Sequence, residues 1–232
     1  MGESPADSEG AGAVPLRRTP QQARSKARLA RVLAAAERVL VEEGVAALTT
    51  TRVASEARVS VGSLYQYLPD RDAIIDALAA GYFAQLEAVT QDLIREASGR
   101  EGSAQRWDDP VGVLVDAYSG IYRTQHGFRA LWFGSGLTER TRAADREHKL
   151  RMADGIRRVL LGLGLGVADD AALGRACHAA VLAADALAQE AFRRDARGDA
   201  DLLDEAKIML RGYLAAITAR SAVRPGPEPF RP

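Results

Sequence analysis

The sequence predicts an all-α protein, and three observations support this class. Alanine, leucine and arginine, all good helix formers, dominate the 232 residues. Apolar residues recur at helical spacing through most of the chain, and no stretch shows the sustained alternation of a β-strand. Proline, glycine and short polar runs interrupt these patterns, which divides the chain into separate helices.

Three helices are expected in the N-terminal part of the chain. The first should span 20–43, because an apolar stripe runs along it and Gly44 suits the position after its last turn. Two short helices should follow over 50–57 and 61–68, the second capped by Ser60 and ended by a proline. This part of the chain is therefore predicted to be a small three-helix unit.

The rest of the chain is expected to form six more helices. Asp70 can cap the first of them, and the proline after Asp109 suits the start of the next. The expected helices begin near 70 and near 110, and the others span 127–133, 138–161, 169–197 and 201–221. The chain thus divides into domains over 21–69 and 70–221. A leader over 1–20 and a tail over 222–232, rich in glycine, proline and polar residues, are expected to be disordered.

Composition excludes several classes of protein. A single cysteine, Cys177, rules out an internal disulfide framework and a multi-cysteine zinc site. The N-terminus lacks the basic and apolar regions of a secretory signal, and no apolar run approaches the ~20 residues that span a bilayer. A soluble, cytoplasmic protein without membrane association is expected.

Charge is distributed unevenly, although the formal net charge is zero. Residues 17–71 hold ten basic and five acidic residues, a net charge of +5. Residues 72–220 hold 19 basic and 22 acidic residues, a net charge of −3. A positive N-terminal unit on a slightly acidic body indicates a nucleic-acid-facing surface. A chance fluctuation explains this charge difference equally well.

The informative segment is 48–78, which reads LTTTRVASEARVSVGSLYQYLPDRDAIIDAL. Two short helices joined by a tight turn are the layout of a helix-turn-helix, whose second helix enters the major groove of DNA. Small and apolar residues suit the inner face of such a motif, namely Val53, Ala54, Ala57, Val59 and Leu64. Thr49 or Thr50 can cap the first helix, so that its N-terminal amides point outward at a phosphate.

This segment resembles the TetR (tetracycline-repressor) family of transcription regulators. The match covers roughly 24–80 and rests on a helix ending in EEG, on LTT…VA, and on S-x-G-S-L-Y-x-Y at 60–67. The resemblance implies a helix-turn-helix DNA-binding domain over 21–69 and a helical effector-binding and dimerisation domain over 70–221. It further implies a homodimeric repressor of a palindromic operator, released by a small-molecule effector.

Position by position, the resemblance assigns seven residues to the DNA interface. Ser63, Gln66 and Tyr67 are expected to face the groove, with Val61 close to base edges. Thr50, Tyr65, Tyr67 and Arg71 are expected at the sugar-phosphate backbone. Hydroxyl groups can donate to phosphate oxygens, and Gln can pair with adenine, which agrees with these roles. The alternative for Tyr65 is a half-buried ring that closes the core of the motif. The basic residues Arg17, Arg18, Arg24, Lys26 and Arg28 can lie along DNA or on a solvated arm.

One position departs from the family pattern. The family usually has glycine in the turn where this chain has Arg58. A left-handed backbone there costs an L-residue roughly 1 kcal/mol. The Arg58 side chain can instead reach a phosphate group.

The body carries a cluster of aromatic residues that suggests a ligand site. Five of the chain's aromatics lie within a short segment: Tyr118, Tyr122, Phe128, Trp132 and Phe133. Aromatic-lined cavities between helices commonly bind small molecules, and His148 and Met152 can line the same space. The resemblance implies an effector pocket in this domain. The alternative is that these rings only fill the core.

Small apolar residues on the last two helices suit close helix packing. They are Ala180, Ala184, Leu187 and Ala191 on one helix, and Ile208, Leu210, Leu214 and Ile217 on the other. The resemblance implies that these two helices form a four-helix dimer interface. An intramolecular core is the alternative, and both can hold together.

No motif supports an enzyme, and neither a cofactor nor a metal is expected. The three histidines lack partners at metal-ligand or triad spacing, and the run LGLGLG at 161–166 lacks the spacing of a dinucleotide fingerprint. A repressor is the leading hypothesis. An effector-independent activator or architectural DNA-binding protein is the second, and an enzyme is the third.

Overall fold

The computed structural model describes residues 20–99, 107–165 and 169–223, and every regular element within these ranges is helical. The N-terminal module consists of α1 (Pro20–Glu43), a 3-10 turn (Val45–Ala47), α2 (Thr50–Ala57) and α3 (Val61–Tyr65). The body consists of α4 (Arg71–Ala97), α5 (Pro110–Thr124), α6 (His126–Phe133), α7 (Glu139–Gly162), α8 (Asp170–Arg194) and α9 (Ala200–Val223). The predicted all-α class is confirmed.

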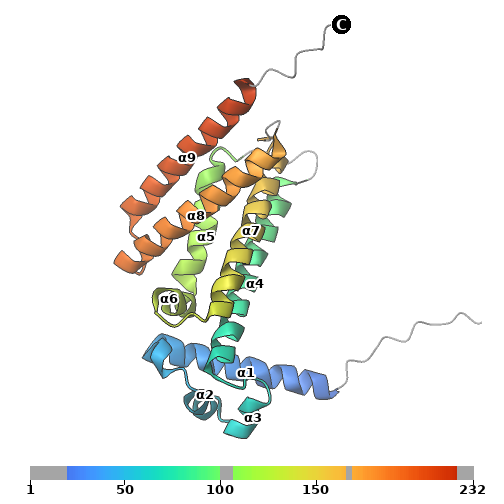
Figure 1. The fold of residues 1–232 in the computed structure, drawn as a ribbon, viewed down its shortest axis with the longest axis vertical. Coiled ribbons are helices and arrows are strands. Elements are labelled where there is room, and N and C mark those ends of the chain that lie inside the picture. Colours follow the sequence, from blue (N-terminus) through green and yellow to red (C-terminus); the bar gives the residue numbers. More distant parts are fainter. Residues whose placement is uncertain (1–19, 100–106, 166–168, 224–232) are drawn as a thin grey trace, which may run out of the picture.

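The module lies at one end of an elongated molecule, and α4 leads from it into the body (Figure 1). In the body α4 packs along α7, α7 packs on α8, and α8 packs on α9. The short helix α6 lies at the end of the body nearest the module and contacts α1. It therefore joins the body to the module at a second point besides α4.

Side-chain caps explain why several helices begin where the sequence predicts. In each case an oxygen of the cap accepts a hydrogen bond from the backbone N–H three residues later, which satisfies a donor that the helix leaves unpaired. The caps are Thr49 for α2, Ser60 for α3, Asp70 for α4, Thr138 for α7 and Asp169 for α8. These helix starts are encoded locally.

Helix ends differ more from the predictions. α3 ends at Tyr65 rather than at residue 68, and the Tyr67 N–H donates to the Leu64 carbonyl at 2.9 Å, so the chain tightens into a turn before Pro69. α8 ends at Arg194 instead of at 197. The expected leader and tail lie outside the described residues except at their edges, where Pro20 begins α1 and Val223 ends α9.

One buried cluster runs from the module into the body. It includes Val32 of α1, Leu64 of α3 and Ile74 of α4, and it continues through Phe128 and Trp132 of α6. Because packed side chains transmit displacement with little compression, a shift of α6 must be accommodated by α4 and α1. The two predicted domains are therefore mechanically joined.

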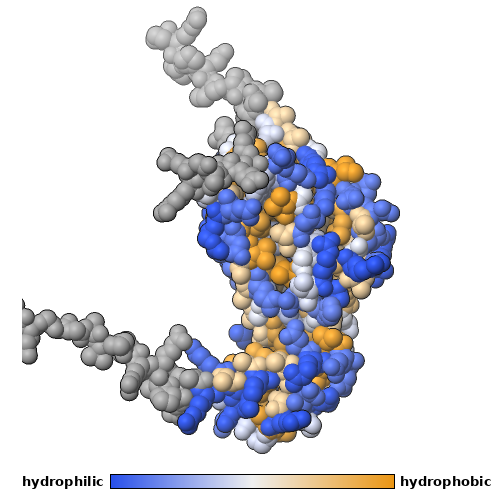
Figure 2. All heavy atoms as spheres, turned by 180° about the vertical axis from the view of Figure 1, so that it is seen from behind, coloured by the Kyte–Doolittle hydropathy of each residue, from blue (hydrophilic) through white to orange (hydrophobic). Residues whose placement is uncertain are grey.

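The surface of the body is partly apolar. On the face opposite to that of Figure 1, apolar side chains gather on the body between hydrophilic ones (Figure 2). Among the described helices, α8 has the length and composition of a membrane-crossing helix. A helix of a soluble protein with one apolar face passes the same test, so this is weak evidence for a membrane.

Candidate DNA-binding surface and ligand cavity

The helix-turn-helix is built around a small buried face. Val53 and Ala54 of α2 and Leu64 of α3 are buried, as the sequence predicts, while Ala57 and Val59 are half-buried against them. The Val59 N–H donates to the carbonyl of Ala54 at 3.0 Å, which closes the turn. The core residues hold α2 and α3 in a fixed relative orientation.

Arg58 occupies the turn in a left-handed conformation, with φ 54° and ψ 47°. It is the only non-glycine residue with positive φ in the described part of the chain. The turn thus keeps the backbone geometry expected for glycine, and the side chain is exposed. Arg58 lines a groove together with Arg31 and Arg38 of α1.

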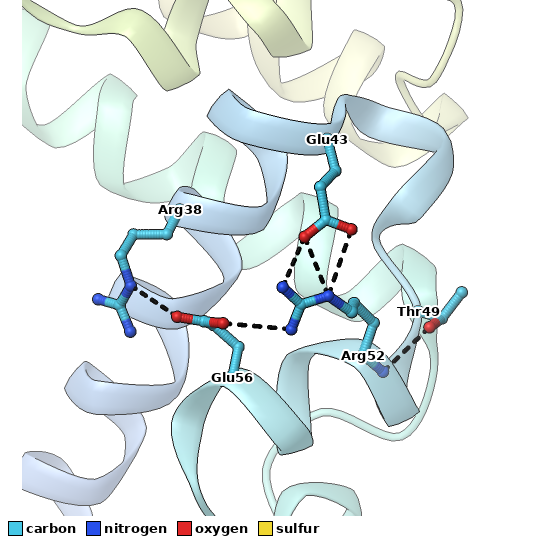
Figure 3. Close-up of polar contacts among 5 residues, drawn as sticks. All are labelled: Arg38, Glu43, Thr49, Arg52 and Glu56. Atoms are coloured by element: carbon cyan, nitrogen blue, oxygen red, sulfur yellow. Dashed lines mark hydrogen bonds and ion pairs between the residues drawn. The ribbon is translucent and has the colours of Figure 1, made fainter.

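An ion-pair network fastens α2 to α1 (Figure 3). The Arg52 guanidinium donates from Nε to Oε1 of Glu43 at 3.0 Å and from Nη1 to Oε2 of Glu56 at 3.2 Å. Arg38 Nε donates to the other oxygen of Glu56 at 3.0 Å. Hydrogen bonds from Arg38 and Arg52 lower the pKa of Glu56, and those to Glu43 and Glu56 raise the pKa of Arg52. Two of the module's arginines are thus engaged within the protein, which sequence reasoning missed.

The structure brings the predicted backbone-contacting residues Thr50 and Tyr65 together. Thr50 Oγ1 lies 3.3 Å from the Tyr65 hydroxyl, which joins the N-terminus of α2 to the end of α3. Tyr65 is 50% exposed and is absent from the buried cluster, so it does not close the core of the motif. The alternative considered for Tyr65 is wrong.

The remaining predicted DNA residues differ in exposure. Gln66 is exposed directly after α3, and Val61 and Ser63 are half-buried. Tyr67 packs against the core, and its hydroxyl accepts from Ser25 Oγ of α1 at 3.1 Å. Arg71 Nη2 donates to the Val45 carbonyl at 3.0 Å. Tyr67 and Arg71 therefore have intramolecular partners besides any DNA.

Three of the basic residues predicted along DNA lie on α1, and two lie outside the described residues. Arg24, Lys26 and Arg28 are exposed on the first turns of α1. Arg17 and Arg18 precede the described residues. The N-terminal half of α1 thus presents positive charge next to the helix-turn-helix.

A cavity of about 140 Å³ lies inside the body. Six of the seven predicted ligand residues line it: Tyr118, Tyr122, Phe128, Trp132, His148 and Met152. Phe133 does not. Its ring stacks on Tyr122 with centroids 6.3 Å apart, and the Arg193 guanidinium covers it at 5.1 Å. The cavity volume is of the order of apolar cavities that take up benzene.

The aromatic wall of the cavity reaches the DNA-binding module through Tyr82. Phe128 and Trp132 stack with centroids 4.4 Å apart, and Tyr82 packs edge-on against Phe128 at 5.7 Å. The Tyr82 hydroxyl donates to Glu37 of α1 at 3.2 Å. Burial and the Glu37 carboxylate raise the pKa of Tyr82, so that its hydroxyl stays protonated and donates. The rings thus line the cavity and fill the core at the same time.

A charged cluster from α5, α7 and α8 forms the polar part of the cavity wall. Lys149 Nζ lies 2.7 Å from Asp145 and 2.9 Å from Asp185. The Tyr122 hydroxyl donates to Asp185 at 2.8 Å. Burial opposes the charge of Lys149, but Asp185 and Asp145 outweigh this effect and raise its pKa. The single ammonium group is therefore shared by two carboxylates.

His148 is buried in the same wall and stacks near Phe83 with centroids 4.9 Å apart. Burial and the nearby Arg151 lower its pKa, which favours the neutral imidazole. Among the described residues its Nε2 atom has no hydrogen-bond partner. Cys177 also lines the cavity, and burial raises its pKa to about 11, so the thiol stays protonated and unreactive. Within the described residues no group of three histidine, cysteine or acidic side chains can hold a metal ion.

Comparisons with known proteins agree with this architecture. Residues 32–78 match a family described as bacterial regulatory proteins, tetR family, and residues 105–218 match the tetracyclin repressor-like C-terminal domain. A TetR-family transcriptional regulator from Streptomyces coelicolor is 31% identical, covering 83% of this chain and 98% of that chain with a TM-score of 0.60. No curated protein matches the sequence.

Two ligand complexes share the fold at lower identity. RolR in complex with its ligand resorcinol is 22% identical and covers 89% of this chain and 98% of that chain, with a TM-score of 0.54. The SmeT–triclosan complex is 19% identical and covers 89% of this chain and 100% of that chain, with a TM-score of 0.55.

The helix-turn-helix on a helical body defines a DNA-binding transcription regulator. With both domains matched and a relative above 30% identity, the chain belongs to the TetR family. Members of this family are generally not enzymes.

Proposed function

We propose that this regulator is a homodimeric repressor that binds a palindromic operator and is released by a small-molecule effector. The observation that carries the proposal is the cavity beside α6, whose aromatic wall is continuous with the core of the module. A ligand releases DNA only if it prefers the protein form that binds DNA poorly. A cavity packed against α4 and α6 is suited to such a preference, because filling it displaces helices that support α1.

For DNA binding, we propose that α3 enters the major groove. Val61, Ser63 and Gln66 would face base edges, and Thr50, Tyr65, Tyr67 and Arg71 would contact phosphates. The exposure of Tyr65 and Gln66 supports this assignment. Arg71 would use the N–H groups that do not donate to Val45. The protein would act in the cytoplasm, where a bacterial regulator meets its DNA.

For dimerisation, we propose that α8 and α9 pair with the same helices of a second copy. Leu182 on α8 is 48% exposed, and Ile208 and Met209 on α9 are 59% and 46% exposed. Large apolar side chains exposed on neighbouring helices are typical of an interface. Two modules placed by such a dimer would read half-sites about 34–36 Å apart.

For the effector, the complexes of RolR with resorcinol and of SmeT with triclosan support a small-molecule ligand in a body of this fold. The alternative is an effector-independent activator or architectural protein. It is expected to have a body core filled by side chains, so the cavity favours the effector-responsive regulator.

The proposal is tested by selecting operator DNA from a random library with the full-length protein. We expect a palindromic sequence bound by a dimer. Affinity should fall ~10³–10⁵-fold between 50 and 200 mM salt if the dimer makes 6–10 phosphate contacts. In a reporter strain, loss of the protein should raise transcription from the operator. A salt-independent affinity, a monomer on DNA, or lower transcription without the protein would each contradict the proposal.

A further inference from the structure

The cavity wall is uneven in polarity along its length. At one end the wall is aliphatic, because the start of α5, the end of α7 and the start of α8 meet the C-terminal half of α9. These helices contribute Val111, Leu114, Leu160, Leu173, Leu214 and Ile217. At the other end, next to α6, the wall carries aromatic rings and the charged cluster of Asp145, Lys149 and Asp185. A matching ligand is apolar with one polar end.

The charges of the wall sum to −1. Asp145, Lys149 and Asp185 are the formally charged residues among the described side chains that line the cavity. Lys149 is 17% exposed and already pairs with both carboxylates. His148 adds no positive charge, since burial lowers its pKa. Arg193 lies over Phe133, outside the lining. A negatively charged ligand would therefore meet no unpaired cation.

The surroundings strengthen the effect of this charge. Most of the lining is aliphatic or aromatic, so charges act through a medium of low polarity and are poorly screened. An anion entering the cavity would lose its hydration and face two carboxylates. A neutral head loses less hydration, and a cation is attracted by the two carboxylates.

We propose that the cavity takes a ring-sized apolar molecule with an uncharged or positively charged head and rejects its anionic counterpart, with Asp145 and Asp185 acting as the charge filter. This inference rests on the proposed function, in which the cavity is the effector site. It goes beyond that function because it names the chemical class of the effector.

Three probes with one skeleton test the filter at pH 7: 2-phenylethanol, 2-phenylethylamine and phenylacetate. Binding is followed by tryptophan fluorescence in full-length Trp107→Phe, which leaves Trp132 of the cavity wall as the reporter. We expect the alcohol and the amine to bind at least tenfold more tightly than phenylacetate. Phenylacetate binding as tightly as the alcohol would overturn the charge filter and leave the proposed effector site standing.

Two further variants identify the source of the discrimination. Asp145→Asn keeps the shape of the side chain and brings the lining to zero charge, so the disadvantage of phenylacetate should shrink severalfold. Glu147→Gln removes the same charge from an exposed residue of α7 outside the cavity and should change nothing. Equal effects of the two substitutions would show that the overall charge, and not the wall, selects the ligand.

Failure of the proposed function gives a different result. If none of the three probes binds to either the parent or the Asp145→Asn protein, the cavity is not a ligand site. This result would contradict both the proposed effector role of the cavity and the charge filter. Probe binding that leaves operator affinity unchanged, with the expected order of affinities, would support the filter and contradict only the release mechanism.

Discussion

The substitution Arg58→Gly should stabilise the protein, because Arg58 holds a backbone conformation that glycine adopts without strain. A left-handed conformation costs a residue with a Cβ about 1–2 kcal/mol. About 0.4–1 kcal/mol of this gain is lost with glycine, because glycine raises the conformational entropy of the unfolded chain. The exposed Arg58 side chain has no hydrogen bond or ion pair to lose within the described residues. The net gain should be about 0.5–1 kcal/mol.

The measurement is urea or thermal unfolding at a fixed protein concentration, since the stability of the proposed dimer would depend on concentration. For a chain of this size, the gain corresponds to a rise in Tm of about 1–4 °C. Arg58→Ala is the matched control, because it removes the same charge from beside Arg31 and Arg38 but keeps the Cβ. If Arg58→Ala stabilises as much as Arg58→Gly, charge repulsion explains the gain and the strain argument is refuted.

Three other predictions concern the helix junction, the buried histidine and the DNA surface. Gly127→Ala should lower the free energy of unfolding by about 1–3 kcal/mol, because a Cβ there would clash with the Tyr82 hydroxyl and lie 3.0 Å from Glu37 Oε1. Gly120→Ala is the control and should not destabilise the protein, because the space around Gly120 is open. The pKa of His148 is lowered from 6.5, so the folded state resists protonation, and stability should be lost as pH falls below that value. The loss of unfolding free energy should be at most about 1.4 kcal/mol per pH unit. The unfolding midpoint of His148→Gln should fall less steeply with decreasing pH than that of the unsubstituted protein. Gln66→Ala should cost roughly 1–3 kcal/mol of operator affinity and relax preference at one base per half-site in a library selection. Unchanged preference would mean that another face of α3 reads the DNA.

Helix positions were predictable from the sequence where local chemistry decides them. Thr49, Ser60 and Asp70 cap their helices through their own side chains, so a few neighbouring residues are sufficient to set the start. The end of α3 was predicted three residues too late, because the proline after Leu68 limits how far the helix can extend but does not set its last residue. The left-handed turn at Arg58 was inferred from the family pattern, and its geometry agrees.

The candidate sites were predictable only in part. The aromatic cluster was visible as a run of rings, and most of these rings line the cavity. Phe133 does not, because Phe128 and Phe133 lie five residues apart and therefore point about 140° apart around α6. Which of the two faces the cavity depends on how α6 docks. The sequence contains no signal for that choice.

The sequence by itself determined the helical class, the helix-turn-helix and the helix starts, since each follows from residues close together in the chain. Only the tertiary structure decided how charges pair. Tyr122 and Asp185 are 63 residues apart, and Lys149 bridges α7 to α8. Arg52 joins α1 to α2 in the same way. Apolar periodicity sets which face of a helix is buried but not which neighbour covers it. The charge of the cavity wall and the anchoring of the DNA-binding module therefore emerge only when the helices pack.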